Sequence, residues 1–388
     1  MYKKIAIIGF GKEGTSALVF LRKTHRRATI DILDRKRRDH YLAHLADYDL
    51  VIKSPGVPWH TPEITQALKK GVKFTTPTAL FFERAKGTII GITGTIGKGT
   101  TATLLYRMLK ARRKQVFLAG NIGTPMLDIL PKLKKSSVIV LELSSFQLER
   151  LPYSPPIAIV LEIFPDHLNY HRGMREYINA KAFIGKNQKN NDDIFFFAHS
   201  RYAKQIARKS KAKKYGVDVK KFTMFQQSDL RLLGAHNFAN AAMAATIAYH
   251  LGVPPAIIKK AALSFRGNPH RLEFVARKRG IAFYNDSAAT IPQAAIAAIR
   301  SIKQPILLIM GGANKNVSIK SLEQEIARTP NIKAVFANMK LSDAFAAALK
   351  KAKKGDAILL SPGAASFDQF RNYKERGNAF KKLVKNLS

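Results

Sequence analysis

Cysteine is missing from this sequence of 388 residues, and its apolar stretches are short. Without cysteine the chain forms neither disulfides nor thiolate metal sites, which is typical of proteins in a reducing compartment. No apolar stretch approaches the roughly 18 residues that span a bilayer. The first such run, 5–9, is short and ends in glycine, so it indicates a buried strand rather than a signal peptide. The sequence therefore predicts a cytoplasmic protein.

Acidic residues are also scarce, 26 against 66 lysines and arginines, which gives a formal net charge of +40. Such an excess is typical of nucleic-acid-binding proteins, because Lys and Arg neutralise phosphates. The charge is spread along the chain, however, with local runs at 35–38, 209–214 and 350–354 and no RNP, zinc-finger or helix-turn-helix pattern. We interpret it as a solvated basic surface that also suits anionic substrates; a nucleic-acid partner is the alternative.

The composition, 46% hydrophobic and 24% charged, is that of an ordered globular chain. Its length suggests two or three domains of roughly 100 to 200 residues. Apolar runs of strand length alternate with helical patterns, which favours βα units, parallel sheets and an α/β fold. These runs are 5–9, 29–34, 50–52 and 88–93, then 116–118, 137–143, 157–162 and 194–198, and finally 281–285, 305–310, 333–337 and 357–360.

Two interruptions divide this pattern. Lys86 and Gly87 come just before the run at 88–93, and Gly and Pro break the pattern at 267–269. We therefore expect three α/β domains, at 1–86, 87–267 and 268–388.

A glycine-containing segment, GITGTIGKGTT at 91–101, follows the strand that starts the second domain. Its glycines let backbone N–H groups approach phosphate oxygens, and Lys98 can reach the terminal phosphates. The segment departs from the strict phosphate-loop pattern at two positions, with Ile92 for the first glycine and Gly99 for the Ser or Thr that ligates magnesium. By itself it favours a nucleotide site over a glycine-rich turn of no function.

Ligand-type residues follow the next strands as well. Glu142 comes directly after the apolar residues 138–141 of the run at 137–143, and Asp166 and His167 follow the run at 157–162. In α/β sheets, ligands bind at the carboxyl ends of the strands, and Mg²⁺ prefers carboxylate and phosphate oxygens. A lone Asp-His pair is more often a surface loop, but three successive strand ends carry such residues here.

The N-terminal segment contains a second glycine pattern, GFGKEG at 9–14, with Asp34 some 20 residues later. This matches the dinucleotide fingerprint, and the basic residues at 35–38 would suit NADP. The fingerprint is weak alone, and nothing later indicates hydride transfer.

Seven ordered motifs extend over essentially the whole chain. They are GNIGTP at 120–125, LELSSFQLE at 141–149, DHLNYHRGMREYINAK at 166–181, GAHNFANAAMA at 234–244, PHRLE at 269–273, NDSAAT at 285–290 and SPGAASFDQFRNYKERG at 361–377. With these motifs the chain resembles the Mur ligase family, and LSSFQLE with ASFDQF indicates its D-glutamate-adding branch. The resemblance implies a Rossmann-like N-terminal domain for UDP, a central P-loop-type ATPase-like domain and a Rossmann-like C-terminal domain for the amino acid.

The resemblance also implies a reaction. ATP would phosphorylate the alanyl carboxylate of UDP-N-acetylmuramoyl-L-alanine, and the D-glutamate amine would attack the acyl phosphate, in peptidoglycan precursor synthesis. We expect a monomer without membrane contact.

Site residues are carried over motif by motif. The catalytic set is Lys98, Glu142, His167, Lys181 and Lys315. ATP would bind at Gly94, Thr95, Gly97, Lys98, Gly99, Thr100 and Thr101, with Asn237 and Asn240 at the adenine and Arg271 and Asp286 at phosphate and ribose. Two Mg²⁺ ions would be held by Glu142, His167, Thr100 and a carbamylated Lys181.

The substrate residues fall into two groups. The UDP part would meet Gly11, Thr15, Ser16, Asp34, Gly56 and Asn121, and D-glutamate would meet Lys315, Thr290, Ser366, Phe367 and Tyr373. For Phe367 and Tyr373, core packing is an equal alternative.

Several positions depart from the family pattern. They are Ile96, Gly99, Asn169, Tyr170 and Ala288. Ala288 stands where the family pattern NDSKAT has lysine. The loss at Ala288 removes a positive charge from the reacting centre. A ligase for another amino acid and a catalytically weakened nucleotide-sugar-binding protein are therefore the alternatives.

Overall fold

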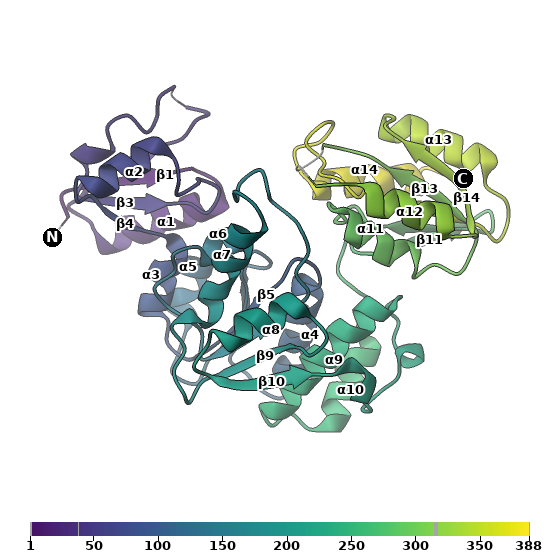
Figure 1. Ribbon diagram of the computed structural model, residues 1–388, viewed down its shortest axis with the longest axis horizontal. Helices are drawn as coiled ribbons and strands as arrows, with labels where there is room; N and C mark the ends of the chain where they lie inside the picture. The colour runs from purple at the N-terminus through teal and green to yellow at the C-terminus, as the bar shows by residue number, and fades with distance from the viewer. Residues whose placement is uncertain (1, 38, 314–316, 388) are drawn as a thin grey trace. The chain divides into compact units, whose positions relative to one another are not determined.

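The computed structural model describes residues 2–37, 39–313 and 317–387, which form three sheets (Figure 1). One compact unit comprises residues 1–94, 113–161 and 175–217, and the other comprises 95–112, 162–174 and 218–388. Within the described residues no helix is long and apolar enough to cross a membrane. The first two sheets belong to the first unit and the third to the second.

The N-terminal sheet is parallel, in the order β2-β1-β3-β4. Its strands are β1 (Lys4–Ile8), β2 (Thr29–Leu33), β3 (Leu50–Lys53) and β4 (Lys73–Thr75). The connecting helices are α1 (Lys12–Thr24), η1 (Leu45–Asp47), α2 (Pro62–Lys69) and α3 (Pro77–Arg84). The central strands β1 and β3 are almost fully buried, as expected of a parallel sheet with covered faces.

The central sheet has six parallel strands in the order β10-β9-β8-β5-β7-β6. They are β5 (Thr88–Thr93), β6 (Val116–Gly120), β7 (Val138–Glu142), β8 (Ile157–Val160), β9 (Asp193–Phe197) and β10 (Lys213–Val217). The helices of this region are α4 (Lys98–Lys110), α5 (Met126–Ile129), η2 (Leu130–Lys132), α6 (Ser145–Leu148), α7 (Met174–Lys186), α8 (Arg201–Arg208), η3 (Val219–Lys221), η4 (Gln227–Asp229), α9 (Ala235–His250) and α10 (Pro255–Ser264).

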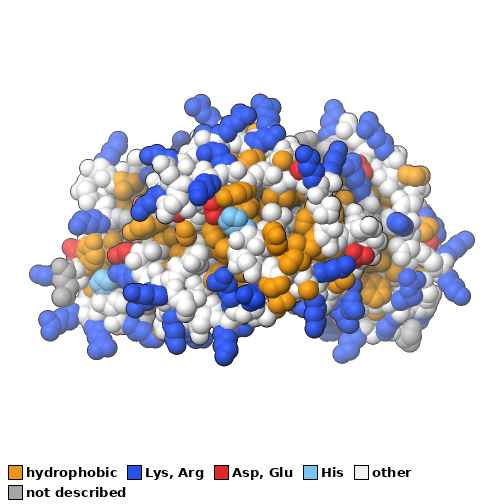
Figure 2. Space-filling model, turned by 90° about the horizontal axis from the view of Figure 1, so that it is seen from below, with side chains coloured by type: hydrophobic (Ala, Val, Ile, Leu, Met, Phe, Trp, Pro, Cys, Tyr) orange, Lys and Arg blue, Asp and Glu red, His pale blue; other side chains and the backbone are white. Residues whose placement is uncertain are grey.

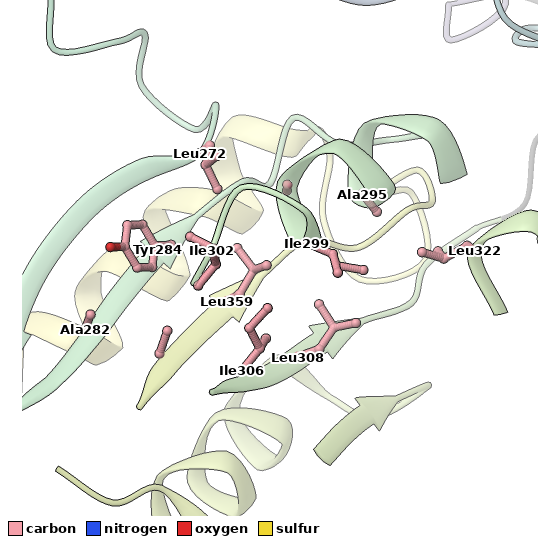
Figure 3. Packing of buried hydrophobic residues seen from close by; sticks show 12 residues of the cluster. Leu272, Ala282, Tyr284, Ala295, Ile299, Ile302, Ile306, Leu308, Leu322 and Leu359 are labelled. Atoms are coloured by element: carbon pink, nitrogen blue, oxygen red, sulfur yellow. The ribbon is translucent and has the colours of Figure 1, made fainter. Parts of the chain in front are cut away.

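The C-terminal sheet has the order β11-β12-β15-β13-β14. Its strands are β11 (Glu273–Lys278), β12 (Ile281–Asn285), β13 (Ile306–Met310), β14 (Ile332–Ala337) and β15 (Ala357–Leu360). Its helices are α11 (Pro292–Ile299), α12 (Lys320–Arg328), α13 (Leu341–Lys351) and α14 (Tyr373–Lys385). Alternate strand residues form two cores, one against α11 and α12 (Figure 3) and one against α13 and α14.

All twelve apolar runs overlap strands, and the predicted α/β fold with parallel sheets is confirmed. Each sheet falls within one predicted block, while the exact limits 1–86, 87–267 and 268–388 stay predictions. Three strands were missed: β4 has only three residues, β10 (KKYGV) contains two lysines and a glycine, and β11 (EFVARK) has three charged residues. The C-terminal sheet is therefore mixed, because β11 pairs with β12 in antiparallel orientation.

Lysine and arginine side chains are scattered over the visible face in Figure 2, in agreement with a solvated basic surface. Among the described residues, three of these cations are buried: Lys53, Lys181 and Arg376.

Candidate active site

Three neighbouring strands of the central sheet carry the motifs. β5 is hydrogen-bonded to β7 on one side and to β8 on the other. Because these strands are parallel, their carboxyl ends lie at one edge of the sheet. Glu142, the last residue of β7, is paired in register with Ile92 just before the glycine-containing loop. The order of strands thus brings together the strand ends that the sequence singled out.

The loop after β5 is shaped around Gly97, the N-cap of α4. Gly97 has φ +84°, and a Cβ there would lie 2.2 Å from Oδ1 of Asn240 on α9. Thr101 on α4 donates its hydroxyl to the same Asn240 oxygen at 3.4 Å. No side chain caps α4, so its first backbone N–H groups suit an anion. Gly99, Thr100 and Thr101 are all buried in the first turn.

Lys98 and Thr95 are held by one contact inside the loop and by contacts with the segment that follows β8. The Lys98 ammonium donates to the Thr95 carbonyl at 2.8 Å. The Thr95 hydroxyl donates to the Phe164 carbonyl at 3.0 Å and accepts the Phe164 N–H at 2.9 Å. These bonds join the loop to the segment that follows β8.

Glu142 is a buried carboxylate with one satisfied oxygen. Oε1 accepts a 2.7 Å hydrogen bond from the side-chain amide of Asn121, whereas Oε2 is buried and has no hydrogen-bond partner among the described residues. A buried carboxylate oxygen without a donor fits a hard divalent cation. Sequence reasoning placed Asn121 at the UDP part of the substrate and missed this contact with Glu142.

Lys181 projects from α7 into the protein and is 1% exposed. Its ammonium donates to the carbonyl of Gly94 at 2.8 Å and lies 4.6 Å from the ring centroid of Tyr177. A helix-surface lysine would be solvated, so this placement agrees with a functional role at the loop after β5.

His167 and Asp166 lie in the segment after β8. The His167 ring nitrogen Nε2 is 3.3 Å from an Asp166 oxygen, and the His167 backbone has φ +55°. A positive φ is uncommon for residues other than glycine and concentrates at functional sites. This backbone conformation favours a functional segment over an ordinary surface loop.

Asn237 and Asn240 are both buried and both lie on α9. Asn237 donates to the Leu233 carbonyl at 2.9 Å, and Asn240 contacts Thr101 as described above. Their assignment to adenine stays a prediction.

A cavity of about 640 Å³ opens at the carboxyl ends of the N-terminal strands. Its lining includes residues 9–14, 34–37 and 54–58, and therefore the predicted Gly11, Asp34 and Gly56. Asp34 accepts the backbone N–H groups of Lys36 and Phe10, which hold the pKa of its carboxyl below its usual range.

Thr15 and Ser16 are not among these lining residues, and both hydroxyls donate hydrogen bonds within the protein. The Thr15 hydroxyl donates to the Gly11 carbonyl at 3.1 Å, and the buried Ser16 hydroxyl donates to Asp128 of α5 at 2.5 Å.

Asp286 directly follows β12 of the C-terminal sheet and is buried. Its two oxygens accept the Leu272 N–H and the Ser361 hydroxyl, both at 2.9 Å. Burial raises the pKa of Asp286 to about 7, against the effects of these bonds and of Arg271. Leu272 has φ +46° and follows Arg271 directly, so the carboxylate fixes the backbone beside the predicted phosphate contact.

Of the predicted acceptor residues, Thr290, Ser366 and Phe367 lie in loops that follow C-terminal strands, and Tyr373 is the first residue of α14. Ser366 is 2% exposed, Thr290 and Tyr373 are half-buried, and Phe367 is 71% exposed, which excludes core packing for Phe367. Thr290 lines an apolar cavity of about 480 Å³. Lys315 lies outside the described residues.

Sequence reasoning missed Arg376. This buried guanidinium donates to the hydroxyl and carbonyl of Ser287, both at 3.0 Å, and to the carbonyls of Ala364, Ala365 and Gly311. It thus joins the loops after β12, β13 and β15. Its place in the ERG of the last motif was the available signal.

Comparison with known proteins is in agreement with this geometry. Residues 92–248 match the Mur ligase middle domain. The UDP-N-acetylmuramoylalanine–D-glutamate ligase of Symbiobacterium thermophilum is 33% identical over 90% of this chain and 86% of its own. That of Acetivibrio thermocellus is 31% identical over 99% of this chain and 97% of its own. The chain belongs to the Mur ligase family.

Solved structures of Mur ligases have the same fold. The UDP-N-acetylmuramate-alanine ligase of Thermotoga maritima has a TM-score of 0.61 at 19% identity and covers 99% of both chains. The MurF ligase of Thermotoga maritima, in complex with ADP, has a TM-score of 0.61 at 17% identity and covers 99% of this chain and 95% of its own. The prediction of an ATP-dependent ligase is confirmed at the level of the Mur ligase family.

The departures from the Mur ligase pattern have different structural settings. Gly99 is buried in the first turn of α4, beside the buried hydroxyls of Thr100 and Thr101. Ala288 donates its backbone N–H to the His270 carbonyl at 2.9 Å, so its position in the loop is fixed although its side chain carries no charge.

Proposed function

We propose that this chain joins D-glutamate to UDP-N-acetylmuramoyl-L-alanine at the expense of ATP, as a cytoplasmic monomer. The observation that carries the proposal is the likeness, at 31–33% identity over 90–100% of the chain, to ligases named for this reaction. Two hydrogen bonds at the carboxyl ends of the central strands support it: Asn121 donates to Glu142, and Lys181 donates to the Gly94 carbonyl.

Amide formation from a carboxylate needs a better leaving group than oxide. The γ-phosphate of ATP therefore passes to the alanyl carboxylate, and the amine of D-glutamate attacks the resulting acyl phosphate and releases phosphate. The uncapped N-terminus of α4 and Lys98 bind the ATP phosphates and offset their repulsion of the substrate carboxylate. Arg271 and Lys315 supply further positive charge.

Magnesium would be held by Glu142, His167 and the hydroxyl of Thr100, with Lys181 as a carbamate. The free oxygen of Glu142 supports the first assignment. The burial of Lys181 supports the second, because a carbamate turns a buried cation into an oxygen donor beside the phosphate loop. When bound, the metal supplies positive charge for the phosphoryl group.

The UDP part would occupy the N-terminal cavity, with its diphosphate at the first turn of α1 and its uridine near Asp34. The uncapped N-terminus of α1 and the basic residues 35–37 in the lining support this placement. D-glutamate would meet Thr290, Ser366, Phe367 and Tyr373.

A Mur ligase for another amino acid is the second candidate, and Ala288 is the observation that favours it. The test measures ADP release with UDP-N-acetylmuramoyl-L-alanine and a panel of amino acids. Release that depends on D-glutamate supports the proposal. Release with another amino acid and none with D-glutamate refutes it in favour of the second candidate. Thermal stabilisation by UDP-sugar without any turnover would identify a binding protein.

A further inference from the structure

Glu13 places a carboxyl group in the first turn of α1, beside the proposed diphosphate site. The helix begins at Lys12, and its N-cap, Gly11, has no side chain to accept the first N–H groups. Glu13 also contributes to the lining of the N-terminal cavity. A helix N-terminus favours one anion, so an ionised Glu13 and a bound diphosphate would repel each other.

The Glu13 side chain joins α1 to the central sheet. Its Oε1 accepts a 2.5 Å hydrogen bond from the side-chain amide of Gln147 on α6. The Gln147 carbonyl oxygen accepts the N–H and hydroxyl of Ser144, at 2.8 and 3.1 Å, within the capping box of α6. Because this oxygen is engaged, the Gln147 –NH₂ group faces Glu13.

The second oxygen of Glu13 has a different environment. Oε2 is buried and has no hydrogen-bond partner among the described residues. The nearest buried cation is Lys53, which donates to the carbonyls of Val57 and Ser54 and lies 4.8 Å from the Trp59 ring centroid. Lys53 thus acts on Glu13 only through space.

Charged groups of several elements surround Glu13. They are Lys12 on α1, Lys53 on β3, Arg84 on α3, Asp128 on α5, and Glu149 and Arg150 after α6, and Asp34, Arg35, Lys36 and Arg37 line the same cavity. Burial raises the pKa of Glu13 to about 7, against the Gln147 hydrogen bond and the Lys53 charge. Burial lowers the pKa of Lys53 to about 8, against Glu149 and Glu13.

We propose that Glu13 is a positioning residue for the UDP-sugar, which fixes the first turn of α1 to α6 and takes up one proton when the diphosphate binds. The inference rests on the proposed placement of the UDP part in this cavity. The diphosphate disfavours the ionised carboxylate, whose Oε2 has no donor to stabilise its charge. The proton comes from solvent and adds to Oε2, so the bond from Gln147 to Oε1 persists.

The sign of the pH dependence follows. Below about pH 7 Glu13 is already neutral, and binding requires no proton. Above that pH the free protein must take up a proton, so affinity falls by up to about tenfold per pH unit until the pKa of the bound state is reached.

Isothermal titration calorimetry with UDP-N-acetylmuramoyl-L-alanine tests this, because its doubly esterified diphosphate does not titrate near neutral pH. Titrations of the full chain at several pH values, each in two buffers of different ionisation enthalpy, give affinity and proton uptake. We expect proton uptake near pH 7.5 and falling affinity above it. Glu13→Gln should bind about as tightly as wild type near pH 6.5, without uptake and with a flatter pH profile.

Glu63→Gln is the matched control, because Glu63 is an exposed first-turn carboxylate of α2 in the same domain. It should retain the wild-type profile. Loss of the Glu13 charge also lowers the pKa of Lys53, which increases proton uptake by Lys53 when an anion binds, so a smaller uptake in Glu13→Gln than in wild type belongs to Glu13.

Equal profiles for wild type and Glu13→Gln would overturn the inference and leave the proposed function intact. Absence of UDP-sugar binding by folded wild type would refute the proposed function and the inference with it. If Glu13→Gln does not fold, Glu13→Asp decides. Its shorter carboxylate should keep the pH dependence but bind more weakly at every pH, and a flat profile would overturn the inference.

Discussion

Gly97→Ala tests whether the phosphate loop is shaped by its contact with α9. Two costs combine at this position. A left-handed backbone costs an alanine about 1–2 kcal/mol, and the new Cβ would lie 2.2 Å from Oδ1 of Asn240. Forced overpacking typically costs a further 1–3 kcal/mol or so. The free energy of unfolding should therefore fall by about 2–5 kcal/mol, a large part of the roughly 5–15 kcal/mol of a typical domain.

Gly252→Ala separates the two costs. Gly252 has a similar φ of +78°, follows the same helix α9, and has no atom within 4 Å of its would-be Cβ. It should lose only the backbone cost. The assays are urea unfolding and ATP binding. In Gly97→Ala, ATP binding should weaken, and adding Asn240→Ala should recover part of the lost stability, as a double-mutant cycle measures. If Gly97→Ala is no less stable than Gly252→Ala, the loop does not depend on Asn240.

Three further predictions concern buried groups. Glu142→Gln should keep the fold, because an amide oxygen still accepts from Asn121, but ADP release should fall on the order of 10²–10³-fold and its magnesium dependence should weaken. Lys181→Ala should abolish turnover, whereas full activity unaffected by bicarbonate would exclude a carbamate role. Burial raises the pKa of Asp286 from 3.8 in the unfolded chain to about 7 in the folded protein. The free energy of unfolding of wild type should therefore fall by up to roughly 4 kcal/mol as pH rises from about 4 to 7, with no further loss from Asp286 above pH 7. Urea unfolding of Asp286→Asn should lack this loss, and an equal loss in that variant would contradict the pKa.

The strands that the sequence predicted are those whose local pattern and tertiary setting agree. β1 and β5 are apolar because both faces of a parallel sheet are covered, so the run itself reveals the strand. β11 is an edge strand with no fully buried residue, so its charged side chains reach solvent, and its pairing with β12 holds it in the sheet. β12 follows after only Arg279 and Gly280, so the signal that was missed is a local hairpin turn.

The site was predictable to a different extent. Motifs identified Glu142 and Lys181, but not what each contacts. The bond from Asn121 to Glu142 joins residues 21 apart, and the bond from Lys181 to Gly94 joins residues 87 apart. These contacts depend on strand order and on the direction of α7, which residue spacing alone does not determine.

The three buried cations show how burial sorts a chain with 66 lysines and arginines. Lys53 ends β3 and holds the loop that lines the N-terminal cavity, Lys181 reaches the loop after β5, and Arg376 joins three loops of the C-terminal sheet. Among the described residues, each predicted block thus has one buried cation that is hydrogen-bonded to a loop at the carboxyl ends of its strands. Burying a cation is unfavourable unless it is paired or hydrogen-bonded, and each of these three cations donates to at least one backbone carbonyl. The general basic surface is a property of composition, whereas these three positions are properties of the fold.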